Sequence, residues 1–414
     1  MDNSSVLMKD RGLTHLAALL GNEYVRQDAD HLHVFPENQQ QVAEILRFAS
    51  AQKLVVTPVG SGTKQGWGNQ VRAGLLLSLS RMNKLREHAW QDMTCTVEAG
   101  ARWTDVQVEL CKHGQMIGLD PLWPERATVG GILATNDSGS LRHKFGGLRD
   151  LIVGMTVVLA DGTIAKTGGK VVKNVAGYDL HKLMTGSFGT LAVIVEVNFR
   201  LHPTEQNART WTLRVPDGQL ADSATFAAPL RALLDTQMTP TSIQLRTSGQ
   251  ESALDIRVAS LPACLDECAV HLRKIAGPNL MVESNIDVWR ARERLFDRKE
   301  AVMLKVSVPT SEICALSAEA QRFGPEVASV AQANGLMTIA ITGDTEQSIE
   351  FISWLRDRVR PVQGSVVIQR LPEAVRARVD VWGAVSNPLP LMQEIKRRFD
   401  PGRTLNPGRF VGNI

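Results

Sequence analysis

The chain has 414 residues, of which 43% are hydrophobic and 21% charged, the composition of a globular protein long enough for two or three domains. Its 46 Lys and Arg against 43 Asp and Glu give a net charge of only +3, and the charges are interspersed, so we expect no nucleic-acid partner. No apolar run reaches the roughly eighteen residues that span a bilayer, so we expect no membrane span. The opening Met1-Asp2 favours a cytoplasmic protein without a signal peptide.

The first part of the chain alternates helical and strand-like patterns. Apolar residues on one face predict a helix after Pro36, and the run 54–57 predicts a short strand that ends at Pro58. Asp161-Gly162 lies between two strand-like runs and predicts a hairpin, and 191–197 is typical of a buried strand.

Three glycine-rich segments recur in the first half, at 58–63, 128–139 and 185–190. Glycine reaches positive φ and lets the backbone approach a ligand closely, so successive N–H groups can converge on a diphosphate. Three such loops indicate one extended, phosphate-bearing cofactor. A Rossmann fingerprint and a Walker loop are both missing, because Gly60, Gly62 and Gly66 have the wrong last interval and no Gly-Lys-Ser/Thr occurs.

The five cysteines are odd in number and widely scattered. This spacing is unlike a disulfide framework or a set of metal ligands, so we expect reduced structural thiols and no metal. If electrons pass through this chain, an iron–sulfur centre must lie in another protein.

Beyond about residue 203 the glycine-rich loops stop, and helical and strand-like pieces alternate to about residue 385. We expect a second α+β domain there. The tail 400–409 contains regularly spaced turn residues, a pattern that is not typical of a linker.

At the glycine-rich loops the sequence resembles the FAD-binding domain of the vanillyl-alcohol oxidase superfamily, also called the p-cresol methylhydroxylase type. The matching stretches are 58–63, 124–131 with Asn136 and Gly139, 142–150, 173–183 leading to 189–191, and 400–403 with 405–408. The resemblance implies an α+β fold with a two-subdomain FAD-binding domain over 1–203 and an α+β cap domain with an antiparallel sheet over 204–385. It also implies that the segment 386–414 returns to the flavin site.

The resemblance further implies which residues bind FAD. The first loop would wrap the pyrophosphate, the second would line the flavin, backbone near 193–195 would meet the adenine, and Asn406 would return toward the isoalloxazine. The residues expected to bind FAD are Pro58, Gly60, Ser61, Gly62, Thr63, Thr128, Gly130, Gly131, Asn136, Ser138, Gly139, Gly189, Val193, Val195 and Asn406. Any single glycine among them can equally be an ordinary turn.

Some members of this superfamily attach the flavin covalently through a histidine of the first loop. Thr63 or Lys64 stands at that position, so we expect non-covalent FAD. Trp67 and Trp123 could pack near the flavin, although core or surface packing is the commoner role.

No catalytic base can be assigned from the sequence. Relatives that oxidise 2-hydroxy acids carry a histidine-rich cluster on the second domain, whereas only His271 lies beyond His202 here. His271 fits an exposed or capping role. The basic residues Arg290, Arg292, Arg294, Arg298 and Lys299 could clamp a carboxylate or form a solvated helix face. Three roles remain possible for Lys173, Tyr178 and Asp179. They are contact with the cofactor, a salt bridge that stabilises the fold, and a buried hydroxyl group.

A cofactor domain without an evident catalytic set resembles the FAD-binding E subunit of bacterial glycolate oxidase, most strongly through 169–187. That resemblance implies a part in the oxidation of glycolate, a small 2-hydroxy acid, to glyoxylate. It also implies two partners, a larger flavoprotein subunit and an iron–sulfur subunit, which pass electrons to a membrane quinone. The location implied is cytoplasmic, or peripheral at the inner membrane through these partners.

Two other functions remain open at this point. One is an autonomous FAD-dependent dehydrogenase of another 2-hydroxy acid or alcohol. The other is a flavin-stabilised assembly subunit without catalytic activity.

Overall fold

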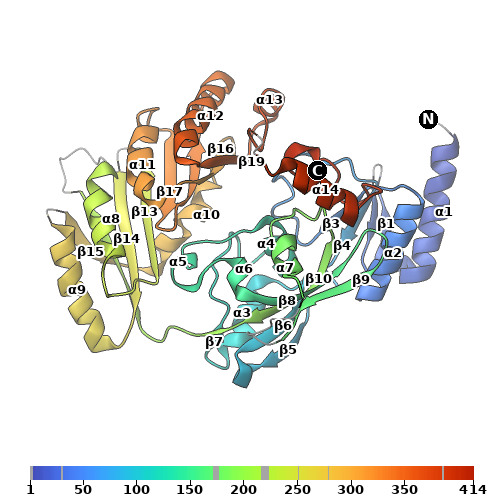
Figure 1. Cartoon of the computed structure of the whole chain (residues 1–414), viewed down its shortest axis with the longest axis horizontal. Helices are drawn as coiled ribbons and strands as arrows, with labels where there is room; N and C mark the ends of the chain where they lie inside the picture. The colour runs from blue at the N-terminus through green and yellow to red at the C-terminus, as the bar shows by residue number, and fades with distance from the viewer. Residues whose placement is uncertain are drawn as a thin grey trace. The chain divides into compact units, whose positions relative to one another are not determined.

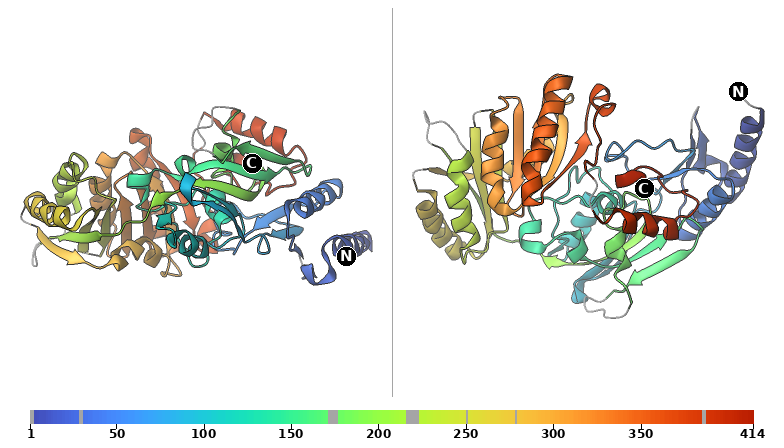
Figure 2. Two further views of the ribbon diagram at one scale, coloured as in Figure 1. Left: turned by 90° about the horizontal axis from the view of Figure 1, so that it is seen from below. Right: turned by 45° about the horizontal axis from the view of Figure 1, so that its top comes forward.

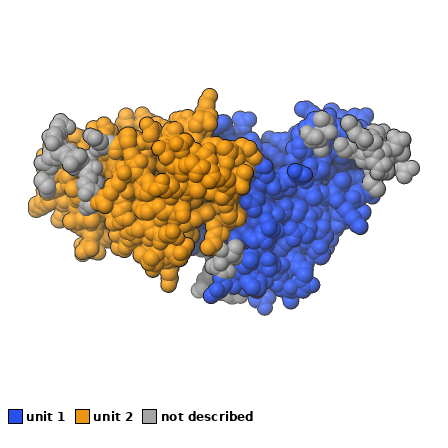
Figure 3. Space-filling view, turned by 90° about the horizontal axis from the view of Figure 1, so that it is seen from above, with its two compact units in different colours: residues 1–137, 147–203, 385–414 blue, residues 138–146, 204–384 orange. Residues whose placement is uncertain are grey.

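The computed structural model describes residues 3–28, 31–170, 177–215, 223–249, 251–277, 279–384 and 387–414 (Figures 1 and 2). Contacts within the chain group it into two compact units (Figure 3). Unit 1 holds residues 1–137, 147–203 and 385–414, and unit 2 holds residues 138–146 and 204–384. The short segment 138–146 thus belongs with unit 2, although the sequence places it inside the expected first domain.

Unit 1 begins with a small mixed sheet in the order β1-β2-β4-β3. Its strands are β1 (Val25–Gln27), β2 (Leu32–Val34), β3 (Val56–Val59) and β4 (Leu75–Ser78). Helix α1 (Asn3–Leu20) precedes this sheet, and α2 (Gln39–Ala51) connects β2 to β3. The helix expected after Pro36 is confirmed as α2, whose N-terminus is capped by the Asn38 side chain, which accepts a hydrogen bond from Gln41 N at 2.9 Å. Strand β3 then ends where the first glycine-rich loop begins.

A second, antiparallel sheet in unit 1 has the order β5-β6-β10-β8-β9. Its strands are β5 (Leu85–Ala89), β6 (Thr94–Glu98), β8 (Ile152–Val158), β9 (Ile164–Gly168) and β10 (Val193–Arg200). The hairpin expected at Asp161-Gly162 is confirmed, because β8 and β9 pair antiparallel and Gly162 has a φ of +80°. The buried strand expected at 191–197 is found as β10, at the centre of the sheet.

The other helices of unit 1 lie between or after these strands in the chain. They are α3 (Trp103–Cys111), α4 (Val129–Thr135), α6 (Leu148–Leu151), α7 (Leu180–Met184) and α14 (Leu389–Phe399), and β7 (Gln115–Met116) pairs with β11 (His202–Pro203). Among the described residues, no helix is both long and apolar enough to cross a bilayer.

Unit 2 is built on one eight-stranded antiparallel sheet, which confirms the fold class expected for the second domain. Its strand order is β15-β12-β14-β13-β17-β18-β16-β19. The strands are β12 (Ala208–Arg214), β13 (Ser242–Ser248), β14 (Glu251–Ala259), β15 (Leu280–Ser284), β16 (Val302–Ser307), β17 (Val327–Gln332), β18 (Leu336–Ile341) and β19 (Ser365–Arg370).

The two faces of this sheet differ in chemistry, because side chains alternate along each strand. One face packs its apolar residues into the core of the unit with four helices, α8 (Ala227–Leu234), α9 (Pro262–Ala276), α11 (Ile313–Gln321) and α12 (Thr345–Val359). The opposite face of β13 and β14 is polar: buried Asp255 accepts hydrogen bonds from Gln244 Nε2 at 2.9 Å and Arg246 Nη2 at 2.9 Å. Gln244 also donates to Val288 O, which brings the short helical turn Ile286–Arg290 against this polar face.

One buried histidine gives unit 1 an expected pH dependence. His181 on α7 is 4% exposed, and its Nδ1 has no hydrogen-bond partner among the described residues. Burial lowers the pKa of His181 below its usual value of 6.5, because protonation would place a charge away from water. The unfolded chain therefore binds more protons below about pH 6.5, and the folded state loses stability as the pH falls through that range.

We expect the free energy of unfolding in urea to decrease from pH 7.5 to pH 5.5, and to decrease less in His181→Gln. His113→Gln, at an exposed histidine of the same unit, serves as the control and should keep the wild-type slope. An unchanged slope in His181→Gln would contradict this assignment.

Candidate cofactor site

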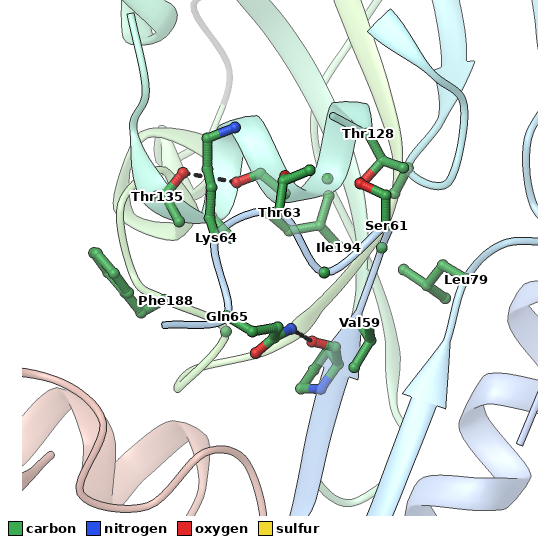
Figure 4. Close-up of a pocket in the computed structure, with 18 of the residues that line it drawn as sticks. Val59, Ser61, Thr63, Lys64, Gln65, Leu79, Thr128, Thr135, Phe188 and Ile194 are labelled. Atoms are coloured by element: carbon green, nitrogen blue, oxygen red, sulfur yellow. Dashed lines mark hydrogen bonds between the residues drawn. The ribbon is translucent and has the colours of Figure 1, made fainter. Parts of the chain in front are cut away.

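A cavity in unit 1 is formed where six separate stretches of the chain meet (Figure 4). They are the loop after β3, the residues directly after β4 and directly after β6, the segment 128–135 with α4, the segment that leads into β10, and the C-terminal segment. The lining residues are Pro58, Val59, Gly60, Ser61, Gly62, Thr63, Lys64, Gln65, Leu79, Ala99, Thr128, Gly130, Gly131, Ala134, Thr135, Phe188, Gly189, Ala192, Ile194, Asn406 and Arg409. Two of the three glycine-rich segments thus meet at one place, and the third reaches it through Gly189.

The first loop turns back on itself directly after β3. Gln65 N donates to Gly62 O at 3.2 Å, and Gln65 Nε2 donates to Pro58 O at 3.1 Å (Figure 4). Gly62 has a φ of +77°, and a Cβ built on it would meet no atom within 4 Å. No protein contact therefore excludes a side chain at this exposed lining residue. Such a position suits a loop whose backbone must approach a ligand.

Gly60 and Gly130 are required by packing within the protein instead. A Cβ on Gly60 would lie 2.0 Å from Thr128 Oγ1, and one on Gly130 would lie 2.9 Å from the Ala99 Cβ. Gly130 N also donates to Ala99 O at 2.7 Å, which fixes the first turn of α4 against the end of β6. Gly60 thus lets the first loop approach the second at Thr128, and Gly130 lets α4 approach the end of β6.

The C-terminal segment closes another side of the cavity. Asn406 accepts a hydrogen bond from Thr57 Oγ1 at 2.7 Å and donates to Phe188 O at 2.8 Å, so its amide connects β3 to the segment before β10. Main-chain bonds from Val56 N to Thr404 O and from Asn406 N to Val56 O hold the segment alongside β3. Asn406 is 1% exposed.

A buried ion pair anchors this segment to the rest of unit 1. Lys396 Nζ on α14 lies 2.6 Å from Asp400 Oδ2 and also donates to Thr190 O at 2.7 Å and Leu405 O at 2.8 Å. Asp400 is fully buried and accepts from the backbone N–H groups of Thr404 and Leu405. The pair therefore fixes both the third glycine-rich segment and the approach to Asn406.

Two cations line the cavity, and both belong to or contact the first loop. Lys64 Nζ lies 3.3 Å from Asp137 Oδ2 and donates to Leu122 O at 3.3 Å, and both charged side chains are at most 4% exposed. Arg409 donates to the carbonyls of Lys64 and Gln65 at 3.2 Å. Burial lowers the pKa of Arg409 to about 10. None of the described lining residues is Asp, Glu or His, so the wall itself has no acidic side chain.

The structure brings together ten of the fifteen residues expected to bind FAD. The cavity wall contains Pro58, Gly60, Ser61, Gly62, Thr63, Thr128, Gly130, Gly131, Gly189 and Asn406. The other five lie outside this wall: Asn136 ends α4 at a φ of +47°, Ser138 and Gly139 belong to unit 2, and Val193 and Val195 are buried on β10. On β10 the alternate residue Ile194 lines the cavity instead.

Several lining residues are absent from the sequence-based set. Lys64 and Gln65 directly follow the expected loop, and Arg409 directly follows the turn that contains Asn406, so chain proximity was an available signal for these three. Thr135 and Phe188 also line the wall, and they lie inside the second and third glycine-rich segments.

The remaining sequence candidates lie away from this cavity. Tyr178 is 88% exposed, and Asp179 forms an ion pair with Lys182 at 2.6 Å, which is the salt-bridge alternative. Lys173 lies outside the described residues. Trp67 and Trp123 approach each other with ring centroids 6.4 Å apart, and Lys64 Nζ lies 5.7 and 5.4 Å from the two centroids.

The arginine-rich stretch of unit 2 contacts protein groups, and His271 is exposed on α9. Arg290 pairs with Glu293, Arg292 donates to Ser138 O at 2.5 Å, Arg294 donates to Asp287 O, and Arg298 donates to Glu326 O. Lys299 forms no hydrogen bond or ion pair with the described residues.

The sequence predicts no metal site, yet three side chains, two before β2 and one within it, offer ligand atoms within 4.8 Å of one another. They are Asp28, His31 and His33. Both imidazoles contact the Asp28 carboxylate itself, at 3.3 and 2.8 Å, so the cluster also forms a hydrogen-bonded turn.

Comparisons with known proteins agree with this geometry. Residues 31–168 match the family described as FAD binding domain. The mitochondrial D-lactate dehydrogenase [cytochrome] of Arabidopsis thaliana is 35% identical over 176 residues, 42% of this chain and 31% of that protein. Glycolate oxidase subunit GlcD of Bacillus subtilis is 35% identical over 178 residues, 43% of this chain and 38% of that protein. The matched region thus spans about a third of the length of these two relatives.

Other similarities extend over the whole chain. A D-lactate dehydrogenase of Anaerostipes hadrus is 27% identical over 421 residues, 90% of this chain and 87% of that protein. The structure of p-cresol methylhydroxylase with substrate bound superposes with a TM-score of 0.72 and 16% identity, over 97% of this chain and 96% of that chain. An identity this low shows the fold alone. The chain therefore has the p-cresol methylhydroxylase-type fold, carries an FAD-binding domain within residues 31–168, and has FAD as its cofactor.

Proposed function

We propose that this chain is an FAD-dependent oxidoreductase of small 2-hydroxy acids, and that it acts as the FAD-binding subunit of a glycolate oxidase complex. The observation that carries the proposal is the cavity in which the glycine-rich loops, β10 and the C-terminal segment meet within unit 1. Support for the substrate class comes from the relatives, which are named D-lactate dehydrogenase and glycolate oxidase subunit.

The lining residues fit FAD in shape and charge. At Gly62 the backbone is left-handed and the space beyond it is open, so main-chain N–H groups of 60–63 can approach a diphosphate. Arg409 supplies positive charge, and Ala134, Phe188 and Ile194 supply apolar surface for a ring system. No histidine is among the described lining residues, which supports a non-covalent cofactor. Acid precipitation should then release all of the flavin into the supernatant.

The composition of the cavity wall also suggests that substrate oxidation needs a catalytic base from outside this wall. FAD, when bound, supplies the acceptor for a hydride equivalent from the carbon that carries the hydroxyl group. The proton of that hydroxyl needs a base, and the described lining residues include no Asp, Glu or His. We infer that the base comes from another part of the chain or from a partner subunit. The larger flavoprotein subunit and the iron–sulfur subunit of the proposed complex are the partners expected.

Anaerobic mixing of the purified, FAD-loaded chain with glycolate tests this proposal. We expect the flavin absorbance near 450 nm to persist with the chain alone and to bleach when the co-expressed partner subunits are present. No bleaching by glycolate or D-lactate in the complete complex would contradict the function.

An autonomous dehydrogenase is the second candidate, favoured by the alignment to the Anaerostipes hadrus D-lactate dehydrogenase over most of both chains. It predicts rapid bleaching of the isolated chain by D-lactate or another 2-hydroxy acid. The same experiment therefore separates the two functions.

A further inference from the structure

Three side chains of metal-binding type meet at the β1–β2 hairpin, which belongs to unit 1 and contributes no residue to the cavity wall. Asp28 directly follows β1, His31 directly precedes β2, and His33 is the central residue of β2. The two strands pair antiparallel with Gln27 opposite Leu32. Asp28 N continues this ladder, because it donates to His31 O at 3.1 Å.

This register places the three side chains on the same face of the hairpin. Asp28 and His31 stand opposite each other, and His33 follows His31 by two residues, the repeat of a strand. Leu32 and Val34 alternate with the histidines and are at most 5% exposed, so they point into the core. The histidine side chains lie on the outer face, where they are 34% and 32% exposed and open to an ion from solution.

The ligand atoms themselves converge. His31 Nδ1 lies 3.3 Å from Asp28 Oδ1, and His33 Nε2 lies 2.8 Å from Asp28 Oδ2. One ligand atom from each residue lies within 4.8 Å of the other two. A tetrahedral Zn²⁺ ion with bonds of about 2.1 Å holds neighbouring ligand atoms about 3.4 Å apart. Small rotations of these side chains are therefore enough to reach the spacing of a zinc site.

The charges around the cluster permit a cation. Two neutral imidazoles and one carboxylate are a ligand set that zinc accepts, with water as a fourth ligand. Arg26 stands opposite His33 in the register, and its charge on this face opposes a cation. Its guanidinium lies over the Phe35 ring, with Cζ 5.3 Å from the ring centroid. This contact engages the opposing charge with an aromatic ring.

We propose that Asp28, His31 and His33 form a binding site for one Zn²⁺ ion or a similar divalent transition-metal ion. The ion replaces the hydrogen atoms that the imidazoles share with the carboxylate, and each neutral ring carries its proton on the nitrogen that does not bind the metal. The bound ion joins the end of β1 to β2, which pairs with β4, and so stabilises the edge of the first sheet. The proposal depends neither on FAD nor on the substrate.

Isothermal titration with zinc chloride tests the site, on the full FAD-loaded chain after a chelator has been added and removed. We expect one Zn²⁺ per chain to bind at micromolar concentration. His31→Gln, His33→Gln and Asp28→Asn should each weaken binding at least tenfold. These variants retain hydrogen-bonding side chains, and Asp28→Asn retains an acceptor for His31 N, whose bond to Asp28 Oδ1 is 2.7 Å. The turn itself should therefore persist.

A second pair of histidines in unit 1 supplies the matched control. The rings of His88 and His113 have centroids 5.0 Å apart, yet among the described residues they belong to no cluster of three possible ligands. The double variant His88→Gln/His113→Gln should bind zinc as the wild type does. Unchanged zinc affinity in the three cluster variants, loss of binding in the control variant, or no saturable binding by the wild type at micromolar zinc would overturn the proposal.

Zinc should also raise the urea midpoint of the wild type more than that of His33→Gln, because an ion that binds the folded state shifts the unfolding equilibrium. The cysteines of the unfolded chain bind zinc too, but they are the same in both proteins, so the difference between the two shifts reports the site. Equal shifts would leave the cluster with the role of a hydrogen-bonded turn and refute the proposed zinc site.

Discussion

Lys396→Met is expected to destabilise unit 1 by about 3–5 kcal/mol, the range found when one partner of a buried ion pair is removed. Asp400 is fully buried, and its carboxylate would keep only the two backbone N–H donors of Thr404 and Leu405. The carbonyls of Thr190 and Leu405 would also lose their donor. We expect a large decrease in the midpoint of urea unfolding.

The double variant Lys396→Met/Asp400→Asn separates the cost of a lone buried charge from the cost of lost contacts. We expect it to be more stable than Lys396→Met alone, because no uncompensated carboxylate remains. Lys112→Met, in an exposed pair, should change stability little and serves as the control. A double variant less stable than Lys396→Met would contradict the assignment.

The same substitution should weaken FAD binding, because Lys396 fixes the backbone directly before Asn406. Leu405 and Asn406 lie beside β3, and Asn406 lines the cavity. Titration with FAD, followed by protein fluorescence at a temperature where the variant is folded, measures this link between the C-terminal segment and the cofactor site.

The sequence pattern identifies most of the glycine-rich part of the cavity wall, whereas it does not indicate the ion pair next to it. Glycine-rich loops are visible locally, since each is a short run that follows a strand-like pattern. The pairing of Lys64 with Asp137 joins two loops that are far apart in the chain, and neither residue has a periodic pattern that would indicate burial. A lysine beside a glycine loop is typical of a solvated side chain, and only the fold places it between two indoles.

Two other differences have equally physical causes. The sequence analysis expects Val193 and Val195 at the cofactor, yet Ile194 lines the cavity. The pattern could not decide between these faces, because every residue in the run 191–195 is apolar. Such a strand is buried on both faces, so its sequence does not tell which face meets a ligand. The segment 138–146 joins unit 2 through contacts such as Arg292 to Ser138 O, which no local pattern encodes.

We expect Gly62→Val in the first glycine-rich loop to weaken FAD binding at least a hundredfold, roughly 2.7 kcal/mol. A Cβ at Gly62 would meet no protein atom within 4 Å, so the new side chain would extend into open space at the cavity wall. It would stand where the backbone must approach the diphosphate. Isothermal titration of the apoprotein with FAD measures the loss directly.

Backbone strain alone must be separated from this steric effect, because Gly62 has a φ of +77° and valine disfavours that region. Gly249→Val is the matched control: Gly249 has a φ of +59°, its Cβ would also meet nothing within 4 Å, and it lies in unit 2 outside the cavity wall. Both variants should lose similar stability in the absence of FAD, and only Gly62→Val should lose affinity. Equal FAD affinities of the two variants would show that the first loop does not contact the cofactor, and would remove the main support for the site described here.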